Sequence, residues 1–183
     1  QGLSVRVKNT FDKYTTPRVY DIEITDNLTY LATIKGIYQY DAQEGTKPVD
    51  CNAILNSTQI NDILFDGSSY WIASRRGLWK TDRLANNGSF KKIMDGDFKS
   101  LIQYKEKTIA ASFSDGIFAF ENGKESFEIL SEVTQINTIS LVNADQLWIN
   151  TTNKGIKRIN LTDNLAEKSI TKRNGLSVYH VRE

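Results

Sequence analysis

The sequence predicts an all-β fold made of β-propeller blades, each with four antiparallel strands. One pattern, an apolar strand, a tight turn ending in glycine and a second strand, occurs four times at intervals of 41, 39 and 39 residues. Its glycines are Gly36, Gly77, Gly116 and Gly155. Short strand candidates also recur about every 8–12 residues, as in all-β folds. A unit of about 40 residues with four short strands is typical of a propeller blade.

Each repeat begins with two apolar residues spaced three apart, which we expect in its first strand. The pairs are Val19 and Ile22, Ile60 and Ile63, Phe98 and Leu101, and Ile136 and Ile139. A turn is expected next at Asp26–Asn27, Asp66–Ser69, Lys105–Lys107 and Asn143–Asp145, with residues typical of hairpin turns in three of these four segments. A fourth strand is expected at Val49–Ile54, Phe90–Met94, Phe127–Leu130 and Ala166–Ile170. No stretch keeps a helical period long enough to predict a helix.

The residues outside these repeats predict a larger array. Leu3–Val7 alternates like a strand and would end a preceding blade, and Asn9–Pro17 reads as a polar connection. We expect a single propeller segment over 1–183, with repeats at about 19–59, 60–97, 98–135 and 136–174 and the start of a further repeat at 175–183. Propellers generally close with about four to eight blades, but because strands of further blades are expected at both ends, this segment is expected to be an incomplete part of a larger propeller. Its exposed flanks would then self-associate or pack on further blades.

The composition argues against several classes of function. The formal net charge is +1, from 23 basic and 22 acidic residues, which argues against nucleic acid as a partner. No apolar run is long enough for direct membrane insertion. Cys51 and His180 are the only residues of their types, so we expect no disulfide, no metal site and no histidine-based catalysis. No glycine loop of the nucleotide-binding type occurs, and no cofactor is predicted.

Polar residues recur at the end of the third strand of every repeat. They are Asp41, Asp82, Glu121 and Asn160. Recurrence in each copy favours turn capping over catalysis, so no catalytic residue is predicted. A pair of carboxylates for glycoside hydrolysis would meet only in space, and the sequence leaves that alternative open.

The hairpin pattern resembles the two-component regulator propeller repeat. Leu147–Thr151 followed by Gly155–Asn160 fits that pattern best, Trp71–Asp82 fits next, and Asn174–Ser177 is similar to the family's lead-in to a new blade. This chain departs from the family where a glycine usually precedes Thr or Ser, and the third copy lacks the tryptophan.

The resemblance implies a periplasmic sensor region of a hybrid histidine kinase. Such a module would be non-catalytic and extracytoplasmic, would belong to a membrane-anchored protein, and would respond to glycan-derived ligands such as an oligosaccharide. Two alternatives remain open: a free-standing propeller scaffold for protein–protein interaction, and a propeller glycosidase or lyase.

The loop between the second and third strands holds the candidate ligand-binding residues. These are Lys35, Arg75, Arg76, Asp115 and Lys154, with Trp79 close by in sequence. Because the repeats place such loops on one face, a cationic rim beside an indole would suit an acidic sugar. The competing interpretation is a set of solvated charged turns.

Overall fold

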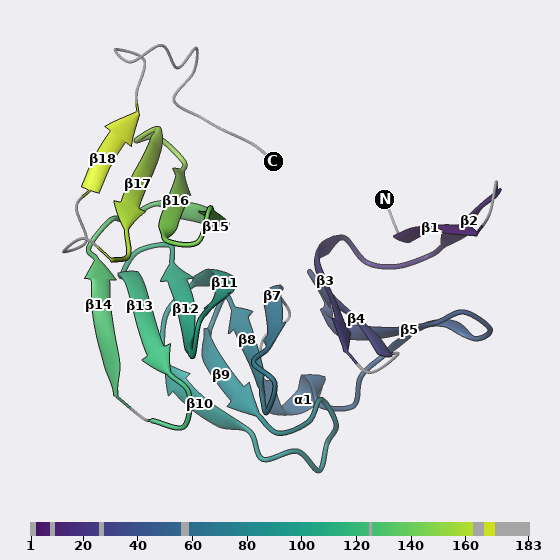
Figure 1. The fold of residues 1–183 in the computed structure, drawn as a ribbon. Coiled ribbons are helices and arrows are strands. Elements are labelled where there is room, and N and C mark those ends of the chain that lie inside the picture. The colour runs from purple at the N-terminus through teal and green to yellow at the C-terminus, as the bar shows by residue number, and fades with distance from the viewer. Residues whose placement is uncertain are drawn as a thin grey trace. The chain divides into compact units, whose positions relative to one another are not determined.

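The computed structural model describes residues 3–7, 10–25, 28–55, 59–124, 126–162 and 167–170, and these are almost entirely β-strands (Figure 1). Four of the five sheets hold four consecutive antiparallel strands, in sheet order that follows chain order. This confirms the predicted all-β architecture of four-stranded blades. The chain divides into two compact units, Gln1–Asp95 and Gly96–Glu183, and each contains two blades.

The first unit contains blades 1 and 2. Blade 1 consists of β3 (Val19–Thr25), β4 (Leu28–Thr33), β5 (Gly36–Asp41) and β6 (Gly45–Pro48). Blade 2 consists of β7 (Ile60–Phe65), β8 (Tyr70–Ser74), β9 (Gly77–Thr81) and β10 (Lys91–Met94).

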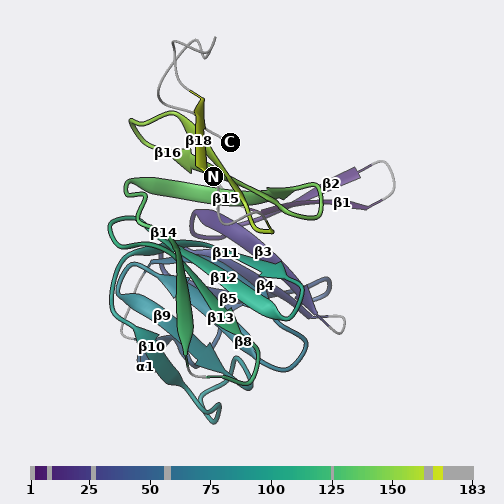
Figure 2. The ribbon, with the colours of Figure 1, turned by 60° about the vertical axis from the view of Figure 1, so that its left-hand side comes forward.

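The second unit contains blades 3 and 4. Blade 3 consists of β11 (Phe98–Tyr104), β12 (Lys107–Ser112), β13 (Gly116–Glu121) and β14 (Phe127–Ser131), whose first three strands lie side by side in Figure 2. Blade 4 consists of β15 (Ile136–Val142), β16 (Gln146–Thr151), β17 (Ile156–Asn160) and β18 (Glu167–Ile170).

A β-bulge explains why each repeat begins with apolar residues three apart. The first strand of every blade shifts register between its first and third residues, for example between Ile60 and Asp62. One extra residue lets positions one and four share a face, although strand residues normally share a face every second position. Ile60 and Ile63 are accordingly 0% and 1% exposed.

Blades 1 and 2 contact each other through an apolar core and through two carboxylates that accept backbone hydrogen bonds across the interface. The core brings together Ile37 of blade 1 and Ile72 of blade 2, among other residues. Beside it, Asp21 Oδ2 accepts the backbone N–H of Ile63 at 3.2 Å, and Glu23 Oε1 accepts that of Phe65 at 2.9 Å. Residue numbers increase in the same direction along β3 and β7 in these two contacts, so the two strands run parallel.

The second unit repeats this packing with aliphatic side chains. Ile109, Ile117, Ile136 and Ile149 belong to one buried cluster between blades 3 and 4. Each of these four side chains is 0% exposed. The apolar pairs of the sequence therefore build the contact between neighbouring blades.

The expected fourth strand at Val49–Ile54 was wrong. The strand lies earlier, at β6, and α1 (Asn52–Leu55) occupies the second half of the predicted range. The backbone pairing with β5 ends where Val49 N donates to Ile37 O at 3.0 Å, and the Asn52 side chain takes the place of further strand: its Oδ1 accepts from Ile37 N at 2.7 Å and its Nδ2 donates to Ile37 O at 2.9 Å. Cys51 and Leu55, one helical turn apart, are both buried in the core.

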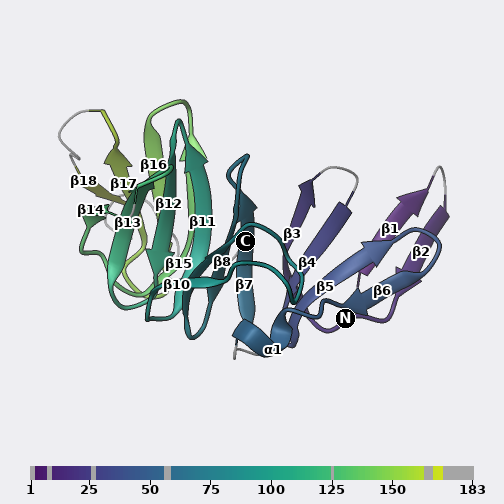
Figure 3. The ribbon, with the colours of Figure 1, turned by 90° about the horizontal axis from the view of Figure 1, so that it is seen from below.

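The polar connection expected at Asn9–Pro17 was also wrong. Its residues Thr10–Tyr14 form β2, which pairs with β1 (Leu3–Val7) in a two-stranded antiparallel sheet (Figure 3). Tyr14 packs edge-on against Tyr40 of β5, with ring centroids 5.1 Å apart. This hairpin therefore contacts the outer strands of blade 1. The turn at Asp26–Asn27, the repeat start at 175–183 and His180 lie outside the described residues.

Cys51 should resist alkylation while the protein is folded. The thiol is fully buried, and burial raises its pKa to about 11, so little thiolate exists at pH 8. Iodoacetamide at pH 8 is expected to label the protein only in urea, as followed by mass spectrometry. Rapid labelling without denaturant would contradict the packing of α1.

Candidate functional site

A buried hydroxyl anchors each glycine hairpin, by which we mean Thr33–Gly36, Ser74–Gly77, Ser112–Gly116 and Thr151–Gly155. All four hydroxyl residues are 0% exposed. Thr33, Ser74 and Thr151 each donate to the carbonyl of the hairpin glycine, at 2.7, 2.8 and 2.6 Å. Each also accepts the N–H of the residue before that glycine, at 3.0–3.2 Å. In these three blades the turn therefore keeps its shape without help from its exposed side chains.

A second hydrogen bond ties every hairpin to the first strand of its blade. The residue after the hydroxyl donates its N–H to the carbonyl that precedes the opening apolar residue. The four pairs are Ile34 to Arg18, Arg75 to Gln59, Phe113 to Asp97 and Thr152 to Gln135, at 2.8–3.1 Å. This bond places the hairpin tips beside the bulges of the first strands.

Glycine is required where the hairpin closes. Gly77 has φ +141°, and a Cβ there would lie 2.8 Å from the Met94 carbonyl oxygen. At Gly116, with φ +104°, a Cβ would collide with the Ser131 carbonyl oxygen. Both the backbone angle and the adjacent fourth strand exclude a side chain.

The first unit exposes a cationic end at its two hairpins. Lys35, Arg75 and Arg76 are all exposed, as is Arg18, which precedes β3 and lies 5.1 Å from the Tyr20 ring. Because β3 and β7 run parallel, both hairpins lie at the same end of the unit. Among the described residues, neither Lys35 nor Arg75 forms an ion pair.

The charged residues at the hairpins of the second unit form hydrogen bonds with hydroxyl groups. Asp115 accepts from the hydroxyls of Ser112 at 2.6 Å and Ser114 at 3.0 Å. Lys154 Nζ donates to Thr134 Oγ1 at 2.8 Å. Sequence reasoning grouped these two residues with the cations of the first unit, whereas in the structure Asp115 bonds within its own hairpin and Lys154 bonds to Thr134, which precedes β15.

Trp79 lies on β9 and packs against the core of the first unit. Its half-buried ring packs against the blade 1–blade 2 core, and the ammonium of Lys92 lies 5.2 Å from the ring centroid. Its Nε1 is buried and has no hydrogen-bond partner among the described residues. This residue belongs to the packing more than to the exposed end of the unit.

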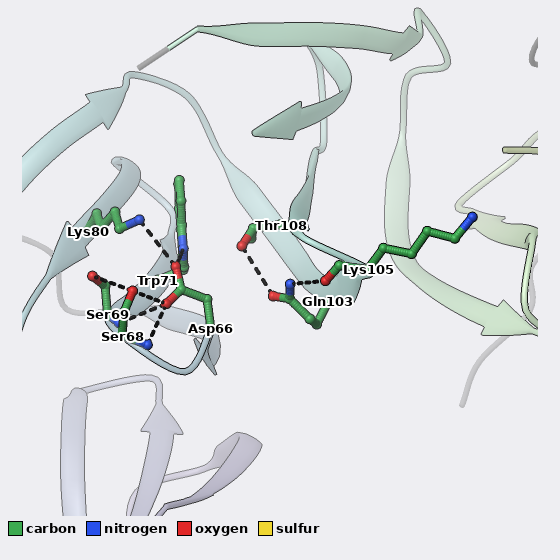
Figure 4. A network of polar contacts seen from close by, with 8 residues as sticks. All are labelled: Asp66, Ser68, Ser69, Trp71, Lys80, Gln103, Lys105 and Thr108. Carbon is green, nitrogen blue, oxygen red and sulfur yellow. Dashed lines mark hydrogen bonds and ion pairs between the residues drawn. The ribbon is translucent and has the colours of Figure 1, made fainter. Parts of the chain in front are cut away.

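Sequence reasoning treated Asp66 only as part of a turn, but it holds a network together (Figure 4). Its carboxylate accepts from the N–H groups of Ser68 and Ser69 and from Trp71 Nε1, at 2.8–2.9 Å. Lys80 pairs with it at 3.2 Å and lies over the Trp71 ring at 4.5 Å. Burial raises its pKa, but the donated hydrogen bonds outweigh burial and lower the pKa to about 2.

The ends of the third strands behave as turn caps in three blades, as predicted. Asp41 accepts the N–H groups of Gln43 and Glu44, and Asp82 accepts that of Ser89 at 2.7 Å. Asn160 likewise accepts the N–H of Thr162 at 3.1 Å. Glu121 differs, because it pairs with Lys124 instead.

The described part of the chain has neither a cluster of metal ligands nor a membrane-spanning helix. No group of three or more His, Cys, Asp or Glu residues there is arranged to hold a metal ion. Of the described helices, none has the length and apolar character needed to span a membrane.

The fold is similar to solved extracellular domains of two-component signalling proteins. The extracellular domain of a hybrid two-component system from B. thetaiotaomicron matches with a TM-score of 0.74 and 15% identity, over 97% of this chain and 25% of that chain. A second such domain from B. thetaiotaomicron matches with a TM-score of 0.65 and 16% identity, over 87% of this chain and 23% of that chain. An ancestral GH74 enzyme matches with a TM-score of 0.63 and 16% identity, over 85% of this chain and 24% of that chain.

These comparisons confirm, as a likeness of fold, the resemblance that the hairpin pattern indicated. No family model matches the sequence, and no curated protein matches it. The chain spans about a quarter of the length of the solved structures named above.

Removing a buried hydroxyl should destabilise its blade. Thr151→Val keeps the side-chain volume but leaves the Lys154 N–H without its partner, and the Gly155 carbonyl keeps only the backbone N–H of residue 151, so the change should cost about 1–3 kcal/mol. Urea unfolding followed by tryptophan fluorescence measures this loss. The exposed Ser140 on β15 supplies the control, since Ser140→Ala should change stability by less than about 0.5 kcal/mol. Equal effects would contradict the anchoring role.

Asp66→Asn should remove a stabilisation that depends on pH. Because the folded-state pKa is about 2, below the usual value of 3.8, the charged carboxylate stabilises the fold above about pH 4, and this stability is lost as pH falls toward 2. The variant should be less stable by about 1–2 kcal/mol at pH 7, and the deficit should shrink at pH 3. Unfolding in urea at both values tests this, with the exposed Asp95→Asn as a control. A deficit independent of pH would show that charge is not responsible.

Proposed function

We propose that this chain is part of the sensor propeller of an extracytoplasmic, membrane-anchored two-component signalling protein. The likeness of fold to extracellular domains of such proteins supports this role, and the described residues supply the blades of that architecture. On this proposal the segment binds a ligand without transforming it. The scaffold and enzyme alternatives gain no specific support from the hairpins.

The proposed ligand is an acidic, glycan-derived molecule that binds at the hairpins of blades 1 and 2. The observation that carries this proposal is the exposed cluster of Lys35, Arg75 and Arg76 at one end of the first unit, with Arg18 beside it. A guanidinium group donates two parallel hydrogen bonds to a carboxylate or sulfate, which the uronic and sulfated sugars carry. The anchored turns hold the backbone of these residues in place before the ligand arrives.

Association through the flank of blade 1 is a second part of the proposal. Ile22 and Ile24 on β3 are 45% and 70% exposed. Their equivalents in blade 2, Ile63 and Phe65, pack against blade 1, and Ile63 is only 1% exposed. The exposed strip therefore fits a further blade of the whole protein or a second copy. A ligand that binds two such arrangements differently would shift the balance between them and so generate a signal.

Binding of oligosaccharides tests the proposed function. A galacturonic acid oligomer and a sulfated disaccharide should bind the chain in calorimetry, more weakly as salt is raised, while neutral cellotetraose should not. The double change Arg75→Ala with Arg76→Ala should weaken binding about tenfold or more. Lys124→Ala, which removes an exposed lysine far along the chain, serves as the matched control.

Several outcomes would contradict this proposal. Equal binding of acidic and neutral sugars, or full binding by the double variant, would remove the role of the hairpin cations. Release of shortened sugars from the incubated oligomer would favour the glycosidase or lyase alternative.

A further inference from the structure

The second unit contains a cavity of about 240 Å³ between blades 3 and 4. Blade 3 provides Ile109, Ala119 and Leu130, which form an aliphatic wall, and Leu161 of blade 4 contributes from beyond β17. Ile109 lies near the start of β12, whereas the glycine hairpin follows the end of that strand. The cavity is therefore separate from the hairpin residues discussed above.

The cavity lies where the third repeat departs from the others. The strand-two residue three positions before the anchoring hydroxyl is Tyr30, Trp71 or Trp148 in blades 1, 2 and 4, but Ile109 in blade 3. Its partner across the hairpin is Gln39, Lys80 or Arg158 in those blades, but Ala119 in blade 3. Blade 3 thus lacks both an aromatic ring and a long side chain at this position.

Blades 1 and 2 show what normally fills this position. Tyr30 packs edge-on against Tyr70 of the next blade, with centroids 5.7 Å apart. In blade 2, the Lys80 ammonium lies over the Trp71 ring. In the second unit the residues equivalent to Tyr30 and Tyr70 are the aliphatic Ile109 and Leu147. The missing rings account for the space.

Charged groups stand at the cavity beside the aliphatic wall. Lys107 Nζ and Glu128 Oε2 form an ion pair of 3.1 Å, and their side chains are 41% and 54% exposed. Both residues line the cavity. An exposed pair of this kind contributes little stability, so its members can separate to meet a ligand that carries both charges.

We propose that this cavity binds a free aromatic α-amino acid. The ring occupies the space left by the missing aromatic side chain, the carboxylate meets Lys107, and the ammonium meets Glu128. The volume agrees, because cavities of about 150 Å³ hold benzene and pockets for drug-sized ligands begin near 300 Å³. The zwitterion complements the adjacent opposite charges, which neither a neutral sugar nor a hydrocarbon does.

Calorimetric titration of the 183-residue chain with L-tryptophan and L-phenylalanine tests this site. At least one is expected to bind saturably, and indole-3-acetate and tryptamine, which each lack one charge, should bind about tenfold more weakly or worse. Lys107→Met and Glu128→Gln should each weaken binding by a similar factor. Lys124→Met, in the neighbouring exposed pair with Glu121, should not.

Ile109→Trp tests the cavity itself, because it restores the aromatic residue of the other repeats and should abolish binding. Circular dichroism checks that the variant is folded, and the two surface variants keep the test independent of this change. Absence of binding at millimolar amino acid, unchanged binding by Ile109→Trp or by both surface variants, or binding of glucose in place of amino acids would each overturn the proposal. The oligosaccharide test above involves different residues, so either proposal can fail without the other.

Discussion

The hydrogen bonds of a buried hydroxyl to both sides of a tight turn are the constraint on which three of the four blades depend. In three blades the hydroxyl satisfies the glycine carbonyl and an N–H of the turn at positions that water does not reach. A buried backbone group without a partner would cost about 1–3 kcal/mol, a large share of the stability of a small domain. The buried hydroxyl thus stabilises the turn, and the exposed side chains, such as those of Lys35 and Arg75, are not needed to hold its conformation.

The recurrence of these local features explains which parts of the fold the sequence could predict. The hydroxyl, the glycine and the apolar pair each have a local reason that recurs in every blade, so four weak copies reinforce one another. The three-residue spacing is a trace of the bulge, although the bulge itself becomes visible only in the strand register. Departures from the repeat could not be predicted in this way. The Asn52 side chain that follows the short β6 leaves no repeating signal, and Thr10–Tyr14, which pairs with Leu3–Val7, shows no apolar alternation of its own.

For the candidate ligand-binding residues, the repeat pattern predicts the position of each residue but not its hydrogen-bond partners. Their position at the hairpin tips follows from the pattern, but whether each charge has a partner depends on residues far away in sequence. Lys154 meets Thr134, twenty residues earlier, while Asp115 turns back to its own hairpin. The Asp66 network was missed because an aspartate in a turn is ordinary, and the five-residue spacing to Trp71 was its only signal.

In a protein built from repeats, the residues that recur explain the architecture, so ligand sites are best sought where the copies differ. Two kinds of difference occur here. At the hairpin tips the charge varies while the backbone stays the same, which alters what the surface attracts without altering the turn. At Ile109 and Ala119 the side-chain volume varies while the strand pairing stays the same, which opens space between blades without breaking a ladder. Because the hydroxyl anchors and the strand register are untouched in both cases, surface charge and interior volume can change independently on one frame. A blade can therefore lose its tryptophan and still fold, provided that neighbouring aliphatic residues keep the rest of the interface closed, as Ile117, Ile136 and Ile149 do.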